Sequence, residues 1–238
     1  MIPRVRWVSM VLGAMLSVAT LSNAQEAGYA AGRGGVGGQM GGAFTLAQDD
    51  YSKSAAPRFA FSGHFRYAMT ARLRWQISPG FTWAGYDDHE PAPFRDLNFP
   101  DDSTKANYLT LLLPTSAQLQ LTTRRGPWLA YVGAGPGVYR VWIENRRKVL
   151  EDPISHNLHR GLYPGASGQA GIERFLKSLP NTSIELSIDT HYVFAERPDQ
   201  FSAGWNSKLL NLGIRFGGNY YFIPNPPKKP DAGVPGTP

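Results

Sequence analysis

The sequence predicts an all-β protein, an eight-stranded antiparallel up-and-down transmembrane β-barrel. Three observations lead to this prediction: apolar and polar residues alternate with a period of two, turn signals divide the chain into eight segments, and the connections are alternately short and long. The composition agrees with a sheet protein, because the 238 residues include 26 Gly, 6 Trp, 11 Tyr and 12 Phe. The chain has no Cys, which excludes disulfides, thiolate metal sites and thiol catalysis.

The first residues have the features of a secretory signal peptide. Arg4 and Arg6 precede an apolar run from Trp7 to Leu21, and small residues lead to a cleavage point after Ala24. An uncleaved membrane anchor is the alternative, but this run is shorter than the roughly 20 apolar residues that a helix needs to cross a bilayer. We therefore expect a signal peptide at 1–24, a barrel domain at 25–222 and a Pro-rich periplasmic tail at 223–238.

The predicted strands follow one another along the barrel domain. In the second of them, the odd-numbered residues from Phe59 to Ile77 are mostly apolar or aromatic, and the even-numbered residues from Arg58 to Gln76 are mostly polar or cationic. Successive side chains of a strand point to opposite faces of the sheet, so one face is apolar and the other is polar. The predicted strands are 33–47, 57–77, 80–87, 106–122, 128–143, 163–176, 182–195 and 207–222.

The connections differ in length in a regular way. Ser78-Pro79-Gly80, Thr123 to Pro127 and Lys177 to Pro180 are short, and the connections between them are long and polar. This alternation is typical of an up-and-down sheet with its tight turns at one end and its loops at the other. The long connections are 48–56, 88–105, 144–162 and 196–206.

The apolar face could cover a protein core, as in a soluble lipocalin-like barrel, or it could contact lipid. Three features favour lipid: the alternation of loop lengths, acids and bases together on the polar face, and aromatic residues near the strand ends. Trp75, Trp128, Trp142 and Phe222 are examples of such aromatic residues. We therefore expect the apolar face on the outside.

The last predicted strand resembles a known signal. Arg215 to Phe222 matches the polar-x-Gly-x-x-aromatic-x-aromatic pattern by which bacterial outer-membrane barrels address their assembly machinery. With Tyr131 to Gly137 and the turn from Ile77 to Phe81, the chain resembles the OmpA/OmpX/OmpW-type eight-stranded outer-membrane barrels. The resemblance implies an outer-membrane location with both termini in the periplasm, and an assembly signal formed by Gly217, Tyr220 and Phe222. The pattern departs from that family because Ile223 to Pro238 follow the signal.

The inward face of the predicted barrel holds ionisable residues. An eight-stranded barrel is only wide enough for its own side chains, and charges buried there must be paired. We interpret this set as a salt-bridge network that fills the lumen, with a path for small ions as the alternative. The network comprises Arg66, Arg72, Arg74, Glu173, Glu185, Asp189, His191 and Arg215.

Other candidate sites have weaker support. Ser187, Asp189 and His191 lie at two-residue steps, which places them roughly 6 to 7 Å apart, too far for a Ser-His relay. The acidic residues that begin at Asp87 have no Ca2+-loop spacing, and no strand visibly fixes His156 and His159 as a metal pair. We predict no catalytic residue, no metal and no cofactor.

These observations predict a non-enzymatic outer-membrane protein with a structural, envelope-stabilising or surface-interaction role. A narrow pore for small solutes or ions and a lipid A-modifying enzyme are the alternatives. The expected partners are outer-membrane lipid, lipopolysaccharide and the barrel-assembly machinery. A nucleic-acid partner is not expected, because the cations are spread along the chain, and the barrel is expected to be monomeric.

Overall fold

The computed structural model describes residues 31–45, 55–56, 58–86, 97–98, 108–194 and 209–222. The predicted signal peptide (1–24) and Pro-rich tail (223–238) lie outside these residues, and so does the acidic segment that begins at Asp87. Their assignments stay predictions. Among the described residues, none forms a helix long and apolar enough to span a membrane.

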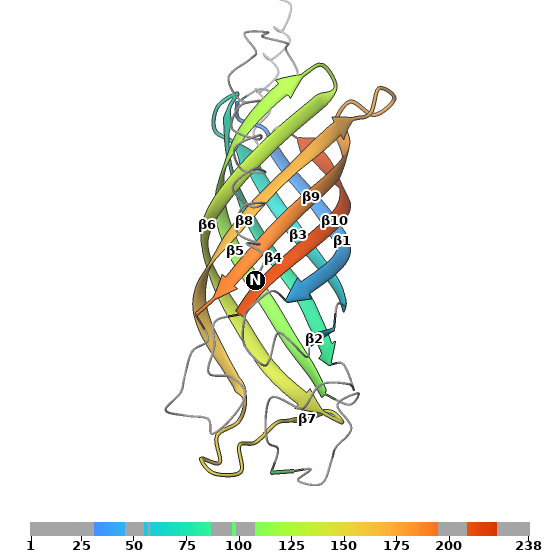
Figure 1. Ribbon diagram of the computed structural model, residues 1–238. Helices are drawn as coiled ribbons and strands as arrows, with labels where there is room; N and C mark the ends of the chain where they lie inside the picture. Colours follow the sequence, from blue (N-terminus) through green and yellow to red (C-terminus); the bar gives the residue numbers. More distant parts are fainter. Residues whose placement is uncertain are drawn as a thin grey trace, which may run out of the picture.

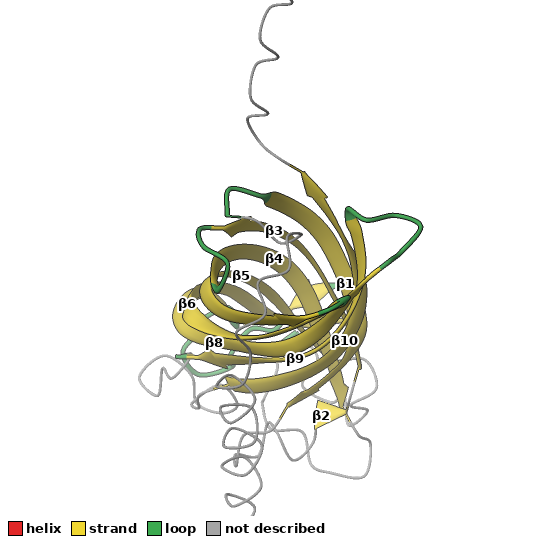
Figure 2. Cartoon of the chain, turned by 90° about the horizontal axis from the view of Figure 1, so that it is seen from above, coloured by secondary structure: helices red, strands yellow, loops and turns green. Residues whose placement is uncertain are grey.

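Long antiparallel strands close into a barrel (Figures 1 and 2). Each pairs with its neighbours in sequence, and β1 pairs with β10 from Gly34 opposite Phe222 to Thr45 opposite Asn211. The predicted eight-stranded fold is therefore confirmed. The eight are β1 (Gly34–Thr45), β3 (Arg58–Ala68), β4 (Leu73–Tyr86), β5 (Tyr108–Arg125), β6 (Trp128–Asn145), β8 (Arg160–Phe175), β9 (Thr182–Val193) and β10 (Leu209–Phe222).

Two further strands of two residues each extend the barrel at its loop end, the lower end in Figure 1. β2 (Ala55–Ala56) pairs with the end of β4, and β7 (Lys148–Val149) pairs with the end of β6. The tight turns lie at the opposite end. The predicted long connection at 144–162 therefore contains a short hairpin of its own.

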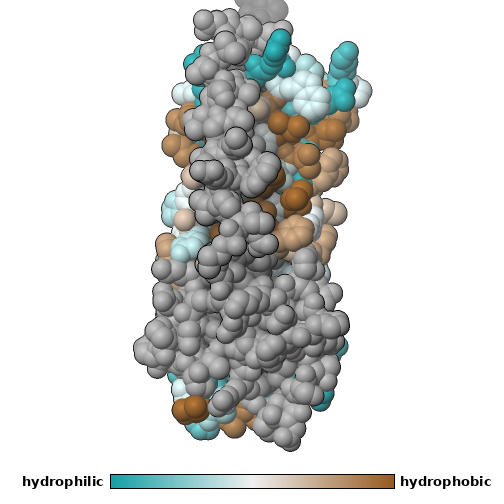
Figure 3. Space-filling view, viewed as in Figure 1, coloured by the Kyte–Doolittle hydropathy of each residue, from teal (hydrophilic) through white to brown (hydrophobic). Residues whose placement is uncertain are grey.

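The barrel is apolar outside and polar inside. Along β9, Ile184, Leu186 and Ile188 point outward and are 39%, 50% and 42% exposed, whereas the alternate residues Glu185 and Ser187 are buried. A soluble barrel would have the opposite arrangement. The part of the wall that is uncovered in Figure 3 has the same apolar character, with hydrophilic residues toward the tight-turn end.

Aromatic side chains gather on the outer wall near both ends of the strands. The rings of Phe59 and Trp83 lie 5.3 Å apart toward the loop end. Toward the tight-turn end, the rings of Phe65 and Trp75 also lie 5.3 Å apart, and Phe222 lies 6.5 Å from Phe65. Two such belts are typical of barrels that cross a membrane, where they lie at the two interfaces.

The prediction of a tight turn at Ser78-Pro79-Gly80 was wrong. The chain turns at 69–72, where the Met69 amide donates to the Leu73 carbonyl at 2.9 Å, and Ser78 to Gly80 lie inside β4. Pro79 has no N–H to give to a neighbouring strand, so the pairing of β3 with β4 is interrupted beside it and resumes in the same register. The assignment of faces is unaffected, since Ala68 pairs with Arg74 and both point inward.

Candidate functional site

The buried charges of the barrel lie in its interior and balance one another. The structure places three arginines there, Arg66, Arg74 and Arg215, with three carboxylates, Glu173, Glu185 and Asp189. Each of these side chains comes from the inward face of a strand. An equal number of cations and acids allows every buried charge to have an opposite partner, which burial in a medium of low dielectric demands.

Arg66 is the centre of the larger group of charges. Its Nη2 lies 2.7 Å from Glu185 Oε1, and its Nη1 lies 3.0 Å from Glu185 Oε2 and 3.1 Å from Glu173 Oε1. The guanidinium also donates to Gln76 at 2.5 Å and to Asn219 at 3.0 Å. Its donors are thus directed at acceptors from four other strands.

Glu173 links the rest of this group. Arg74 Nη1 lies 2.6 Å from Glu173 Oε1, and the Tyr221 and Ser183 hydroxyls donate to Glu173 Oε2 at 2.5 and 3.0 Å. The Tyr131 hydroxyl donates in the same way to Glu185. Both glutamates therefore accept hydrogen bonds from charged guanidinium groups and from neutral hydroxyl groups. Such an arrangement offsets the cost of burying an ion pair.

His64 and Gly37 fit together at the edge of this group. His64 Nε2 contacts Asn219 Oδ1 at 2.5 Å, and these two side chains fill the space where a Cβ on Gly37 would lie. A glycine in β1 is therefore required for the interior side chains to meet at this point.

Glutamines and serines fill the middle of the barrel. Gln76 Nε2 donates to Gln169 Oε1 at 2.9 Å, Gln120 Nε2 donates to Gln76 Oε1 at 3.1 Å, and Gln169 Nε2 donates to Gln39 Oε1 at 3.2 Å. Gln118 donates to Ser167 at 3.0 Å. This neutral layer joins the charged group near the tight turns to a second one nearer the loops.

The second group contains Arg215, Asp189 and His191. Arg215 Nη2 donates to Asp189 Oδ2 at 2.7 Å, and Arg215 Nη1 donates to Ser62 at 2.8 Å. His191 Nε2 lies 2.9 Å from Asp189 Oδ2, and its Nδ1 lies 3.2 Å from the Tyr139 hydroxyl. Both ring nitrogens of His191 thus have partners.

This geometry does not favour a hydrolase. Ser187 accepts a weak hydrogen bond from Gln169 at 3.4 Å, and His191 is directed at Asp189 and Tyr139 instead. A nucleophile needs a base within hydrogen-bonding distance. Among the described residues, no group of three or more metal-ligating side chains occurs.

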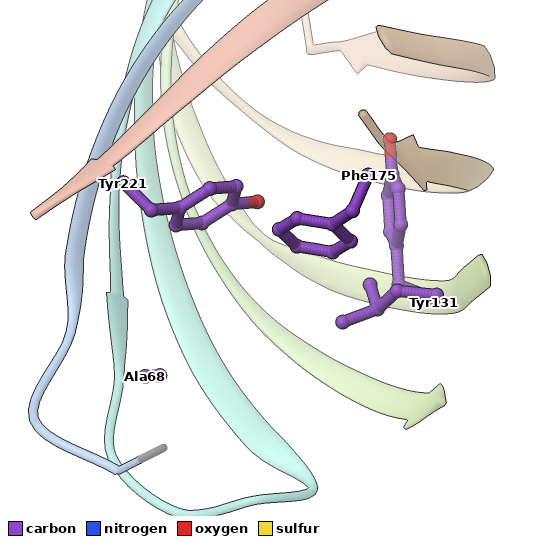
Figure 4. Packing of buried hydrophobic residues seen from close by; sticks show 5 residues of the cluster. Ala68, Tyr131, Phe175 and Tyr221 are labelled. Carbon is purple, nitrogen blue, oxygen red and sulfur yellow. The ribbon is translucent and has the colours of Figure 1, made fainter. Parts of the chain in front are cut away.

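An apolar cluster closes the interior at the tight-turn end (Figure 4). Tyr221 and Phe175 point toward each other with ring centroids 5.5 Å apart. The guanidinium of Arg124 lies 4.9 Å from the centre of the Phe175 ring. The cluster consists of Ala68, Leu129, Tyr131, Phe175 and Tyr221.

One member of the predicted charge network lies elsewhere. Arg72 is exposed in the turn between β3 and β4, because the chain turns at 69–72 instead of after Ile77. The other members, Arg66, Arg74, Glu173, Glu185, Asp189, His191 and Arg215, are all buried inside the barrel.

Several neutral members of the network were not predicted from the sequence, although one signal for them was available. His64, Asn219 and Tyr221 share the polar face of their predicted strands with the arginines, and this shared face could have identified them. Tyr131 and Glu173 are brought together with them only by the closure of the barrel.

The residues of the predicted assembly signal lie on both faces of β10. Gly217 is on the inward face opposite Gln39, whereas Tyr220 is 52% exposed on the outer wall. Phe222 is also on the outer wall, next to Phe65. Their role in assembly stays a prediction.

Comparisons with known proteins reveal the same architecture. No family model and no curated protein matches the sequence. The crystal structure of Neisserial surface protein A (NspA) matches with a TM-score of 0.52 at 12% identity, over 79% of this chain and 97% of NspA. The outer membrane protein OprG from Pseudomonas aeruginosa matches with a TM-score of 0.49 at 12% identity, over 82% of this chain and 98% of OprG. The match to NspA confirms that the chain has the fold of the eight-stranded outer-membrane barrels.

Proposed function

We propose that this protein is a small, non-enzymatic outer-membrane barrel that stabilises the envelope or presents its loops for surface contact. The proposal rests on one observation above all: charge-balanced ion pairs and an apolar cluster occupy the interior, where a pore would need an open path. The apolar outer wall and its two aromatic belts support a place in a bilayer.

The proposed location is the outer membrane, with the termini and the tight turns on the periplasmic side. A monomer accords with this proposal, because β1 pairs with β10 and each of the eight long strands that the structure describes has a partner on both sides. The expected surroundings are outer-membrane lipid and lipopolysaccharide, after delivery by the barrel-assembly machinery. The test is fractionation of cells that express the protein: it should be found with outer membranes and should change its electrophoretic mobility on boiling. Recovery as a soluble periplasmic protein would contradict the proposal.

A recording of single channels tests the closed interior. Purified protein in a planar bilayer should give no discrete conductance steps, because the ion pairs of Arg66 and Arg74 and the cluster around Phe175 lie across the lumen. Discrete steps from the wild-type protein would instead favour the narrow pore. Mass spectrometry of lipid A from expressing cells tests the other alternative, a lipid A-modifying enzyme, since such an enzyme would change the mass of lipid A.

A further inference from the structure

Two arginines flank a tryptophan on the outer wall at the tight-turn end of the barrel. Arg125 is the last residue of β5 and lies directly opposite Trp128, the first residue of β6. Arg174 of β8 lies opposite Trp128 on its other side. Residues directly opposite each other in neighbouring strands share a face of the sheet, and all three are exposed on the outer wall. We refer to Arg125, Trp128 and Arg174 as the interfacial cluster.

The three side chains of the cluster are close enough to act together. The guanidinium of Arg174 lies 5.3 Å from the centre of the Trp128 ring. Neighbouring strands of a sheet are about 4.8 Å apart, so the backbones of Arg125 and Arg174 are separated by about 10 Å, with Trp128 between them. A small anion beside the indole ring is therefore within reach of both long side chains.

The cluster offers hydrogen-bond donors without an acceptor. At the other end of β6, the indole N–H of Trp142 donates to Glu144 at 2.6 Å. In contrast, no described residue accepts a hydrogen bond from the indole of Trp128 or from the side chain of either arginine of the cluster. Indole and guanidinium groups only donate, so the cluster is complementary to a negatively charged acceptor.

Carboxylates are absent from the sequence beside the cluster. Residues 122–128 and 174–182, which form the adjoining strand ends and turns, contain no Asp or Glu. Glu173 precedes Arg174 but points into the barrel, where it is fully buried in ion pairs. The acidic segment that begins at Asp87 follows β4 at the loop end, the other end of the barrel.

The ends of the chain carry few acids as well. Residues 25–33 contain one, Glu26, and residues 223–238 contain one, Asp231. These segments continue from β1 and β10, which lie four and three strands away from β6 in the order of the barrel. The sequence therefore supplies no concentration of negative charge to neutralise the cluster.

The cluster lies at the edge of the apolar wall. Toward the middle of the barrel, Ile172 on β8 is 45% exposed and Leu121 on β5 is 61% exposed. Arginine side chains at such an edge pack their stems on apolar surface and extend their charged ends toward water, and tryptophan prefers the same level. An anion bound by the cluster is therefore at the level of lipid headgroups, with apolar wall beside it for acyl chains.

We propose that the interfacial cluster binds the phosphate of an anionic glycerophospholipid, of the phosphatidylglycerol class, in the leaflet that faces the periplasm. This inference rests on the proposed outer-membrane location, with the tight turns on the periplasmic side. Guanidinium groups bind phosphate oxygens through paired hydrogen bonds, and the indole N–H adds a further donor. Phosphatidylethanolamine has a similar phosphate but also an ammonium group, to which no described residue beside the cluster offers a carboxylate. The site therefore favours a lipid with net negative charge.

The test measures lipid binding by native mass spectrometry of the protein folded in a neutral detergent. Phosphatidylglycerol and phosphatidylethanolamine with the same acyl chains are the two probes, and the wild type should bind phosphatidylglycerol more tightly. Arg125→Gln/Arg174→Gln should weaken binding of phosphatidylglycerol about 30-fold, because each cation near an anionic surface contributes about fivefold. The same variant should lose most of the preference over phosphatidylethanolamine.

A matched variant removes the same charge from the same end of the barrel. Arg33 precedes β1, and Arg72 is in the turn between β3 and β4, on strands that are not neighbours of β6. Arg33→Gln/Arg72→Gln should leave the affinity for phosphatidylglycerol within about twofold of the wild type, since exposed charges more than about 10 Å apart are largely screened by salt. Both double variants should unfold at the same urea concentration as the wild type, because neither removes an ion pair of the interior.

Three outcomes would overturn the inference: unchanged phosphatidylglycerol affinity in the cluster variant, an equal loss in the matched variant, or equal binding of both lipids by the wild type. Fractionation tests the proposed function separately. If the cluster variant is found with outer membranes, shifts on boiling and keeps full affinity, the cluster is refuted and the outer-membrane proposal stands. Recovery of the wild type as a soluble periplasmic protein would instead defeat the proposed function, whatever the lipid titration gives.

Discussion

Arg66 and Glu185 form a bidentate ion pair between strands that are not neighbours. Nη2 of Arg66 lies 2.7 Å from Oε1 of Glu185, and Nη1 lies 3.0 Å from Oε2. Arg66 is on β3 and Glu185 on β9, and the strands β1 and β10 lie between them. The hydrogen bonds of the sheet join each strand only to the next one. This pair instead connects strands across the interior and so helps to fix the cross-section of the barrel.

Removing the cation of this pair should destabilise the barrel strongly. Arg66→Met leaves Glu185 buried without its main partner, and breaking a buried pair costs about 3 to 5 kcal/mol. The free energy of unfolding is measured by urea titration of tryptophan fluorescence in lipid vesicles. Arg72→Met is the matched control, because Arg72 is exposed, and its effect should stay within about 0.5 kcal/mol. Equal effects of the two changes would contradict the network.

The two faces of β9 should respond differently to substitution. Leu186→Arg places a charge on the outer wall, which costs about 2 to 4 kcal/mol near the midplane of a bilayer. Ser187→Ala, one residue further and inside, loses one weak hydrogen bond and should be mild. Both are assessed by the fraction of protein that folds into vesicles. If Leu186→Arg folds as well as the wild type, the outer wall does not contact lipid.

We expect the assembly machinery to bind the aromatic residues at the end of β10 before the barrel has folded. Phe222→Ala should lower the amount of assembled barrel in outer membranes without reducing export, because the assembly machinery is expected to bind this residue. Deletion of 226–238 should have little effect, since the tail follows the signal. The heat-sensitive electrophoretic form measures assembly. A similar loss from both changes would indicate that the tail is what the machinery binds.

A pH effect is expected in the loop between β7 and β8. Burial lowers the pKa of His159 to about 4 from its ordinary 6.5, although Asp152 4.0 Å away opposes this shift. The unfolded loop binds a proton at higher pH than the folded loop does, so stability is full above about pH 6.5 and falls as the pH approaches 4.

Hydrogen exchange measures this effect. The Ile143 amide donates to the His159 carbonyl at 3.0 Å, and its exchange, corrected for the intrinsic rate, should become faster between pH 7 and 5. His159→Gln should remove the pH dependence, because glutamine does not titrate in this range. His156→Gln should retain it, since His156 is exposed in the same loop. A flat profile in the wild-type protein would count against the effect.

The faces of the strands could be predicted from the sequence, but the position of one turn could not. Ser78-Pro79-Gly80 has the residues of a turn, whereas the actual turn at 69–72 has neither Gly nor Pro. Outside the turn residues, such as Arg72, both placements assign the same residues to the inside, so the alternation of polar and apolar residues could not distinguish them. The predicted strand 57–77 was, however, twice as long as a membrane-crossing strand of about 9 to 11 residues, which indicates a turn within it.

The partners inside the barrel are harder to predict than the faces. The inward direction of Arg66 follows from its parity, but its contact with Glu185 depends on the register of every strand between them. Arg72 shows the same limit, because an error in a single turn moved it from the interior to the surface. Parity is a local property of the chain, whereas pairing across the barrel is determined by its closure.

Because β1 pairs with β10, the barrel cannot close before its last strand has been synthesised. Gly34 meets Phe222, so the first strand leaves the ribosome long before the strand that completes it exists. Until then one edge of β1 has no partner strand. Contacts between residues so far apart in the sequence also form slowly, because a long loop must first be closed. The unfolded chain must therefore be kept apart from other unfolded chains until it reaches the membrane. A chain that lacks either β1 or β10 cannot close the barrel.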